Sequence, residues 1–330
     1  MLAEGVERLT GRQWRMENDY GKKEQMQYKE IGQIEGVHTC KTVTSLKDLT
    51  EIKGRYKLDS FGWIFRGQKC ACRPLSTTLE REIIAGKMEN RWKQEAVILR
   101  EFTRRVHHYV AEESVPKSTL EWFALMRHYG APCRLLDCTY SFYVAEFFAL
   151  RNLNQMNRTA AIWAINRDWL RDCRNTIFGN DVSFKYPQEF YEYFLNHEKQ
   201  LTFASEVNPF RINQRLTAQQ GVFLCPGDVR KSFMENLVSM AKIVNPSTGE
   251  YGEGIIRIPI ASDIKTTLIR ELHQMNINSA TLFPDLTGFA ESLSQWFHMP
   301  DTIIPHDDEL VDALRNEFPD ERQAPQNKIF

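Results

Sequence analysis

The chain has 330 residues, of which 42% are hydrophobic, and its formal net charge is −1 at pH 7. This suffices for a large core, in one domain or in one domain with extensions, and the balanced charge argues against a surface that attracts nucleic acid everywhere. No apolar run reaches bilayer length and the first residues lack a signal peptide's apolar segment, so we expect a cytoplasmic protein without a membrane partner.

The seven cysteines do not indicate a disulfide framework, because their number is odd and the chain shows no secretion signal. Cys70 and Cys72 have a poor spacing for zinc ligands, and no Cys-x-x-Cys pair occurs. We therefore expect reduced, mostly buried thiols and no metal.

The first landmark along the chain is an apolar strand that ends in polar residues. Residues 1–36 before it mix both charge signs without a clear period, which predicts an N-terminal arm, and Ser45 begins a short helix. The strand spans 61–68 and ends with Arg66 and Gly67. The guanidinium can bind a phosphate or carboxylate through two parallel hydrogen bonds, and the glycine would let a ligand approach the backbone. An arginine paired with an internal carboxylate is the alternative.

A long amphipathic helix is predicted between Arg91 and Glu112, because apolar residues recur there in steps of three and four. Its arginines and histidines fall largely on other faces. They either form a solvated face or contact nucleic acid, and the sequence leaves both interpretations open.

The stretch from Ser118 to Leu150 is where we expect the chemistry. Ser118 and Glu121 have capping-box spacing, which predicts a helix that ends at His128–Gly130. A short strand over 133–136 and a polar cluster of Asp137, Thr139 and Ser141 should follow. A second helix, over 142–153, is apolar on nearly every side and belongs in a core.

The remaining elements alternate between strands and helices. Strands are predicted over 160–165, 222–224, 255–260 and 280–283, and helices over 168–174, 188–194, from Ser262 onward and over 286–297. Residues 298–330 have the composition of a tail. The chain has no Gly-rich Rossmann turn, P-loop, His-Glu-x-x-His motif or nucleophile elbow, which disfavours those enzyme classes.

These landmarks resemble the FRG domain family, which is named for the Phe-Arg-Gly found here at 65–67. The matching segments are 65–68, 125–139, the 141–149 region, 219–223 and 282–288. Threonine is usual in the family at position 133 and tryptophan at 138, where this chain has cysteines. The resemblance implies an FRG domain over 37–297, with the arm before it and the tail after it.

FRG domains are more distantly similar to NAD-dependent ADP-ribosyltransferases, which implies an α+β fold with two small mixed sheets around a split cleft. In that likeness Arg66-Gly67 matches the first-strand arginine and 219–227 matches the third strand. The position of the catalytic glutamate is Gly221. Its substitutes, in order of preference, are Asp137, Glu146 and Glu206.

The resemblance implies roles for a larger set of side chains. The catalytic candidates are Arg66, Asp137, Glu146 and Gln219, and the NAD-binding candidates are Arg66, Gly67, Gln68, His128, Tyr129, Arg134, Thr139, Ser141 and Gln220. A helix-capping role for Asp137, an exposed position for Glu146, a helix-dipole role for His128 and a salt bridge for Arg134 are the structural alternatives.

The function that follows is transfer of ADP-ribose from NAD to a macromolecule, in a bacterial or phage toxin or defence system. Nucleic acid or protein would be the acceptor, with a possible antitoxin or immunity partner. The alternative is an FRG module that senses NAD or another nucleotide without consuming it, or that binds a partner.

Overall fold

The computed structural model describes residues 33–110, 115–151, 158–179, 189, 195, 201–210, 213–244 and 253–296. Apart from residues 33–36, the expected arm lies outside this part of the chain. So do the expected tail and most of the expected helix over 188–194.

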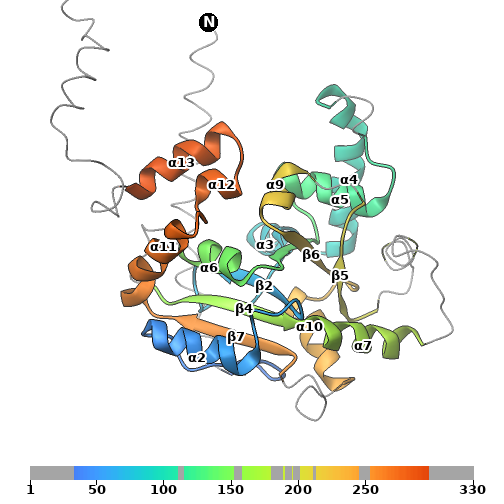
Figure 1. Cartoon of the computed structure of the whole chain (residues 1–330). Helices are drawn as coiled ribbons and strands as arrows, with labels where there is room; N and C mark the ends of the chain where they lie inside the picture. Colours follow the sequence, from blue (N-terminus) through green and yellow to red (C-terminus); the bar gives the residue numbers. More distant parts are fainter. Residues whose placement is uncertain are drawn as a thin grey trace, which may run out of the picture.

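Strands and helices are interspersed along the described part of the chain (Figure 1). The strands are β1 (His38–Thr39), β2 (Trp63–Gln68), β3 (Leu136–Thr139), β4 (Ala160–Asn166), β5 (Ala204–Val207), β6 (Gly221–Pro226) and β7 (Ile255–Ile260). The α-helices are α2 (Leu46–Tyr56), α3 (Thr78–Ala85), α4 (Arg91–Arg105), α5 (Thr119–His128), α6 (Phe142–Leu150), α7 (Arg167–Phe178), α9 (Gln214–Ala218), α10 (Phe233–Ser239), α11 (Lys265–Gln274), α12 (Ser279–Leu282) and α13 (Leu286–Trp296). Three short 3-10 turns, Val106–His108, Met240–Lys242 and Ser262–Ile264, extend α4, α10 and α11.

The described strands form one seven-stranded sheet in the order β1-β7-β4-β2-β3-β6-β5. The β1–β7 pair is parallel and the others are antiparallel. The expected α+β class is therefore confirmed. Instead of the two small sheets that we expected, the described strands form one continuous sheet. The sheet narrows at a seam between β2 and β3, where only Phe65 and Thr139 are in register, whereas β2 and β4 pair from Trp63 to Gln68.

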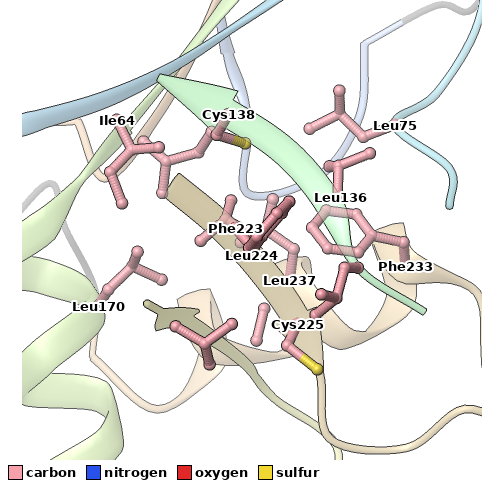
Figure 2. Packing of buried hydrophobic residues seen from close by; sticks show 14 of the residues in the cluster. Ile64, Leu75, Leu136, Cys138, Leu170, Phe223, Leu224, Cys225, Phe233 and Leu237 are labelled. Carbon is pink, nitrogen blue, oxygen red and sulfur yellow. The ribbon is translucent and has the colours of Figure 1, made fainter. Parts of the chain in front are cut away.

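Two apolar clusters cover the faces of this sheet. Every residue of β4 is buried, as expected of a strand with helices on both sides. On one face, β2 and β3 pack with β6, α7 and α10, and Figure 2 shows Ile64, Leu136, Cys138, Leu170 and Phe233 in this cluster. On the other face, α2, α6 and α11 pack over β2, β4 and β7.

Helix α6 lies directly against β2, and Gly67 makes this possible. A Cβ atom on Gly67 would stand 2.5 Å from the Ala149 amide nitrogen and closer still to the Ala145 carbonyl oxygen. The Ser141 hydroxyl accepts from the Val144 amide and caps the helix. The glycine that we expected to admit a ligand therefore admits a helix backbone.

Two expected strands are wrong. Residues 133–135 precede the strand, because the backbone of Cys133 bonds the Thr78 hydroxyl, and β3 begins only at Leu136. Residues 280–283 include helix α12, which starts at a reciprocal cap between Asn278 and Thr281. A four-residue helix is too short to show its period in the sequence.

Five cysteines are buried thiols, as expected: Cys40, Cys133, Cys138, Cys173 and Cys225. The expectation is wrong for Cys70 and Cys72, which form a disulfide in the loop after β2. Two cysteines separated by a single residue can be brought close by a local turn, and ligand-spacing arguments do not detect such a pair.

Candidate functional site

Arg66 lies at the seam where β2 and β3 separate. If the ladder continued past Phe65 and Thr139, Gly67 would stand opposite Asp137, but no such pair forms. Nη1 of Arg66 instead donates to the Asp137 carbonyl oxygen and lies 3.8 Å from its carboxylate. The arginine thus satisfies a strand carbonyl that has lost its partner, and two of the catalytic candidates lie side by side.

A second arginine, Arg127 of helix α5, also contacts Asp137. Nε of Arg127 donates to Oδ2 of Asp137 at 2.7 Å, and Nη2 contacts the same oxygen. Burial alone would raise the pKa of Asp137, but Arg127 and then Arg66 outweigh it, so the pKa lies below its ordinary value. The side chain keeps 40% of its surface exposed. Asp137 is therefore an accessible carboxylate that is ionised at neutral pH.

A third arginine, Arg215 on α9, completes what we call the arginine cluster: Arg66, Arg127, Arg215 and Asp137. Arg215 is close enough for its charge to lower the pKa of Asp137, and its guanidinium lies 4.4 Å from the centre of the Phe283 ring. Two guanidiniums contact the Asp137 carboxylate and the charge of a third acts on it, so positive charge is in excess here and the region is attractive to anions.

Sequence reasoning did not select Arg127 or Arg215. Arg127 directly precedes His128 in the longest matching segment, and Arg215 lies four residues before Gln219. A cation adjacent to a matching segment is the signal that could have found both.

Three further binding candidates, His128, Tyr129 and Gln220, have exposed or half-buried side chains. His128 on α5 places Nδ1 3.2 Å from the Asn213 amide nitrogen. Burial and then Arg215 lower its pKa, so the ring is neutral at pH 7. Tyr129 is 64% exposed, and its ring is free to cover a flat ligand. Gln220 is exposed with φ of 46°, an uncommon backbone conformation for a residue with a side chain.

Gln219 connects strand β3 to helix α12. Its Nε2 donates to the Leu282 carbonyl at 2.9 Å, and its own carbonyl accepts from the Thr139 hydroxyl at 2.8 Å. Its amide oxygen has no hydrogen bond among the described residues. Gln219 therefore has an acceptor available for a ligand, whereas the Thr139 hydroxyl is buried and occupied.

Three further binding candidates are occupied within the fold. Ser141 caps α6, as described above. The side chain of Gln68 accepts from Trp163 Nε1 at 2.8 Å and donates to the Pro74 carbonyl at 3.1 Å. Gly67 lies under α6. Their contacts hold the strand ends in place around the cluster.

Arg134 lies away from the cluster, in a buried ion pair with Glu95 of α4. The two residues are 2% and 4% exposed, and Arg134 Nε donates to Glu95 at 2.7 Å while Nη2 contacts its other oxygen. The Arg134 guanidinium also lies over the ring of Phe123 on α5, 5.4 Å from the ring centre. Of the two interpretations left open by the sequence, the structure has the salt bridge.

The two alternative acids also lie outside the cluster. Glu206 is bidentate with Arg167, at 3.0 and 2.9 Å, and accepts from the Tyr140 hydroxyl at 2.6 Å. Glu146 is 3% exposed, and the charges nearest to it are those of Lys53 and Glu271. No described residue forms a hydrogen bond or an ion pair with the Glu146 carboxylate.

Removing the Glu146 carboxylate should stabilise the protein at alkaline pH. Burial raises the pKa of Glu146 from 4.5 to about 8. Between these values the unfolded chain releases its proton while the folded chain keeps it, so this group lowers stability as pH rises. We expect Glu146→Gln to gain on the order of 3 kcal/mol at pH 9, less than the roughly 5 kcal/mol of the full shift because the buried amide is also desolvated.

The gain should vanish well below pH 4.5, where both states of the parent chain are protonated. Urea unfolding at pH 5, 7 and 9 tests this, with Glu51→Gln on the exposed face of α2 as the control. An equal stability difference at all three pH values would contradict the pKa that burial gives Glu146.

The space beside position 221 is filled by Leu216 of α9. A Cβ atom on Gly221 would overlap Cδ1 of Leu216 and lie 3.2 Å from the Leu216 carbonyl oxygen. Helix α9 therefore covers the start of β6, and the same helix carries Arg215. Among the described residues, no group of three His, Cys, Asp or Glu side chains is placed to hold a metal ion.

None of the helices in the described part of the chain combines the length and apolar composition needed to cross a bilayer. Comparison with curated proteins and with solved structures gave no match. Residues 62–158 match the model of the FRG domain, a segment that contains Arg66, Arg127 and Asp137 and ends before Arg215. The chain therefore contains an FRG domain at residues 62–158.

Proposed function

We propose that the arginine cluster binds NAD and that the protein transfers its ADP-ribose to a macromolecule. The observation that carries the proposal is the accessible, ionised Asp137 held between Arg66 and Arg127. Arginines bind phosphate oxygens in a two-pronged geometry, and an ionised carboxylate stabilises positive charge that develops on a sugar. A dinucleotide with a pyrophosphate next to a ribose presents both groups.

In this reaction the bond between nicotinamide and ribose C1′ breaks, and nicotinamide leaves with the electron pair. The acceptor's nucleophile forms the new bond to C1′ and loses a proton. Asp137 lies beside the ribose and stabilises the cationic transition state, while Arg66 and Arg127 fix its orientation. Arg66 also keeps Nε and Nη2 without hydrogen bonds to described residues, which leaves donors for the pyrophosphate. Water in place of the acceptor would give an NAD glycohydrolase.

The amide oxygen of Gln219 accepts from a ribose hydroxyl or contacts the acceptor, and Tyr129 covers the nicotinamide or adenine ring. The acceptor is nucleic acid or protein. Helix α4 supports nucleic acid through its exposed Arg100, Arg104 and Arg105, although the last two share Glu101. Such an activity suits a cytoplasmic toxin or defence protein that is controlled by an immunity partner.

A second candidate is an FRG module that binds NAD or another nucleotide without turnover. The specific observation in its favour is Gly221, because Leu216 occupies the space into which a side chain at this position would extend.

Incubating the full chain with NAD and a mixture of protein, RNA and DNA should release nicotinamide and label one acceptor class. Asp137→Asn keeps the shape of the side chain and should lower release at least about 100-fold, because a preorganised charge at the transition state is lost. Asp168→Asn, which breaks an exposed ion pair on α7, is the control and should leave the rate unchanged.

Isothermal titration separates the two candidates. Binding of NAD by the parent chain without nicotinamide release supports the sensing module. Neither binding nor release by the parent chain rejects both.

A further inference from the structure

The charges around the cluster are not compensated equally. Arg66 and Arg127 share Asp137, and Arg151, at the end of α6, pairs with Glu291 at 2.8 Å. Arg215 has no hydrogen bond and no carboxylate within ion-pair distance among the described residues. Its charge is therefore the one in this region that an incoming anion can compensate without breaking an existing pair.

Arg215 is nevertheless held in place. The Asn213 side chain caps α9 by accepting from the Leu216 amide at 2.7 Å, and Leu216 lies against Gly221. The guanidinium lies over Phe283, which is only 7% exposed. A planar guanidinium that lies over an aromatic ring has its N–H donors around its edge, where they are available to a ligand.

The Arg151 guanidinium also lies over the Phe283 ring, 4.6 Å from the ring centre. Burial, Arg151 and Arg127 lower the pKa of Arg215, whereas Asp137 and Asp285 raise it. The Asp285 carboxylate accepts from the Gly288 amide at 2.8 Å and is not in an ion pair with Arg215. Arg151 and Arg215 are two positive charges on the same ring and repel each other. An anion bound between them and the rest of the cluster would reduce this repulsion.

We infer that Arg215 binds one phosphate of the ligand while Arg66 and Arg127 face the other, so that the site selects nucleotides with two linked phosphates over nucleotides with one. The inference rests on the proposed NAD site and names the group that the site recognises. The phosphate on Arg215 replaces water at an uncompensated charge, whereas the phosphate near Arg66 competes with Asp137. Arg215 therefore contributes more to affinity than its place outside the matched family segment suggests.

The test compares ADP-ribose, which has a pyrophosphate, with AMP, which has one phosphate, by isothermal titration of the full chain. The parent should bind ADP-ribose about 10- to 100-fold more tightly than AMP, the range of a hydrogen bond to a charged group. Arg215→Gln should lose that difference, because only the side of the cluster with Arg66 and Arg127 is then left to bind a phosphate of either ligand. Arg215→Lys should recover part of it, because lysine keeps the charge and loses the fork.

Arg171→Gln, which removes an exposed arginine on α7, is the matched control and should bind as the parent does. Thermal unfolding of each variant separates lost binding from lost folding. The inference is overturned if folded Arg215→Gln keeps the preference for ADP-ribose, or if the parent shows no such preference.

The two proposals fail in different ways. Selective binding of ADP-ribose through Arg215 without any nicotinamide release from NAD refutes the transferase and leaves this inference standing. Nicotinamide release that is lost in Asp137→Asn but unaffected by Arg215→Gln refutes the inference and leaves the transferase standing.

Discussion

Gly67→Ala should prevent the chain from folding stably, although it adds a single methyl group. That methyl would lie 2.5 Å from the Ala149 amide nitrogen and closer still to the Ala145 carbonyl oxygen. Both are backbone atoms of α6, so no side-chain rotation relieves the overlap and the helix must leave the sheet. We expect a cost above about 4 kcal/mol, a large part of the roughly 5–15 kcal/mol that holds a domain together.

Thermal unfolding and the yield of folded protein measure this effect. Gly54→Ala is the matched control, because Gly54 is an exposed residue within α2 and a Cβ there meets nothing within 4 Å. It should stabilise the protein by about 0.5–1 kcal/mol, the difference in helix propensity. A Gly67→Ala protein that melts like the parent but no longer binds nucleotide would instead assign this glycine to ligand approach.

Glu95→Gln should destabilise the protein by about 3–5 kcal/mol, because it leaves Arg134 charged and buried without a partner. Arg134 Nη1 is already buried without a hydrogen bond, so the neighbourhood has no spare acceptor to offer. The pair joins α4 to the segment that leads into β3. Its loss should also loosen the packing around α5, the helix that carries Arg127. Urea unfolding measures the change.

Glu101→Gln on the same helix is the control, since Glu101 pairs with Arg104 and Arg105 at the surface and should matter little. The double variant Glu95→Met and Arg134→Met removes both charges and should recover most of the lost stability. A Glu95→Gln protein as stable as the control would show that Arg134 is hydrated or finds another partner.

Continuous apolar segments and capping residues made much of the fold predictable. The strand over 255–260 matches β7, and the strand over 160–165 lacks only the last residue of β4. Ser45 caps α2 as expected. Buried central strands contain few polar residues, so their sequences leave little choice of structure.

The strands near the site were harder to place. Asp137 and Thr139 suggest a loop in the sequence, but both belong to β3, because Arg66, Arg127 and Gln219 satisfy their polar groups from elsewhere in the chain. Strand β5 was missed within a segment of mixed aromatic and polar residues. Long-range partners of this kind leave no local pattern.

The candidate site was only partly predictable, because its residues come from segments that are far apart in the sequence. Arg66 and Asp137 were both selected from matching segments, 65–68 and 125–139, and the structure brings them together. Arg134 was selected from a matching segment and Glu146 as an acid in an apolar helix. The structure pairs Arg134 with Glu95 and buries Glu146 without a hydrogen-bond partner among the described residues. Arg215 was missed because its position depends on how a five-residue helix packs against Gly221 and Phe283.

We expect the sheet to open first at the single registered pair between β2 and β3. Amide hydrogens of β3, β6 and β5 should exchange with solvent through an opening that leaves β4 and β7 protected, since few backbone bonds join the halves. A ligand that engages Arg66 on one half and Arg127 on the other ties the two together. A bound ligand would then slow the exchange of amide hydrogens in β6 and β5, which are distant from the ligand. Amide exchange in these strands would therefore report whether the site is occupied.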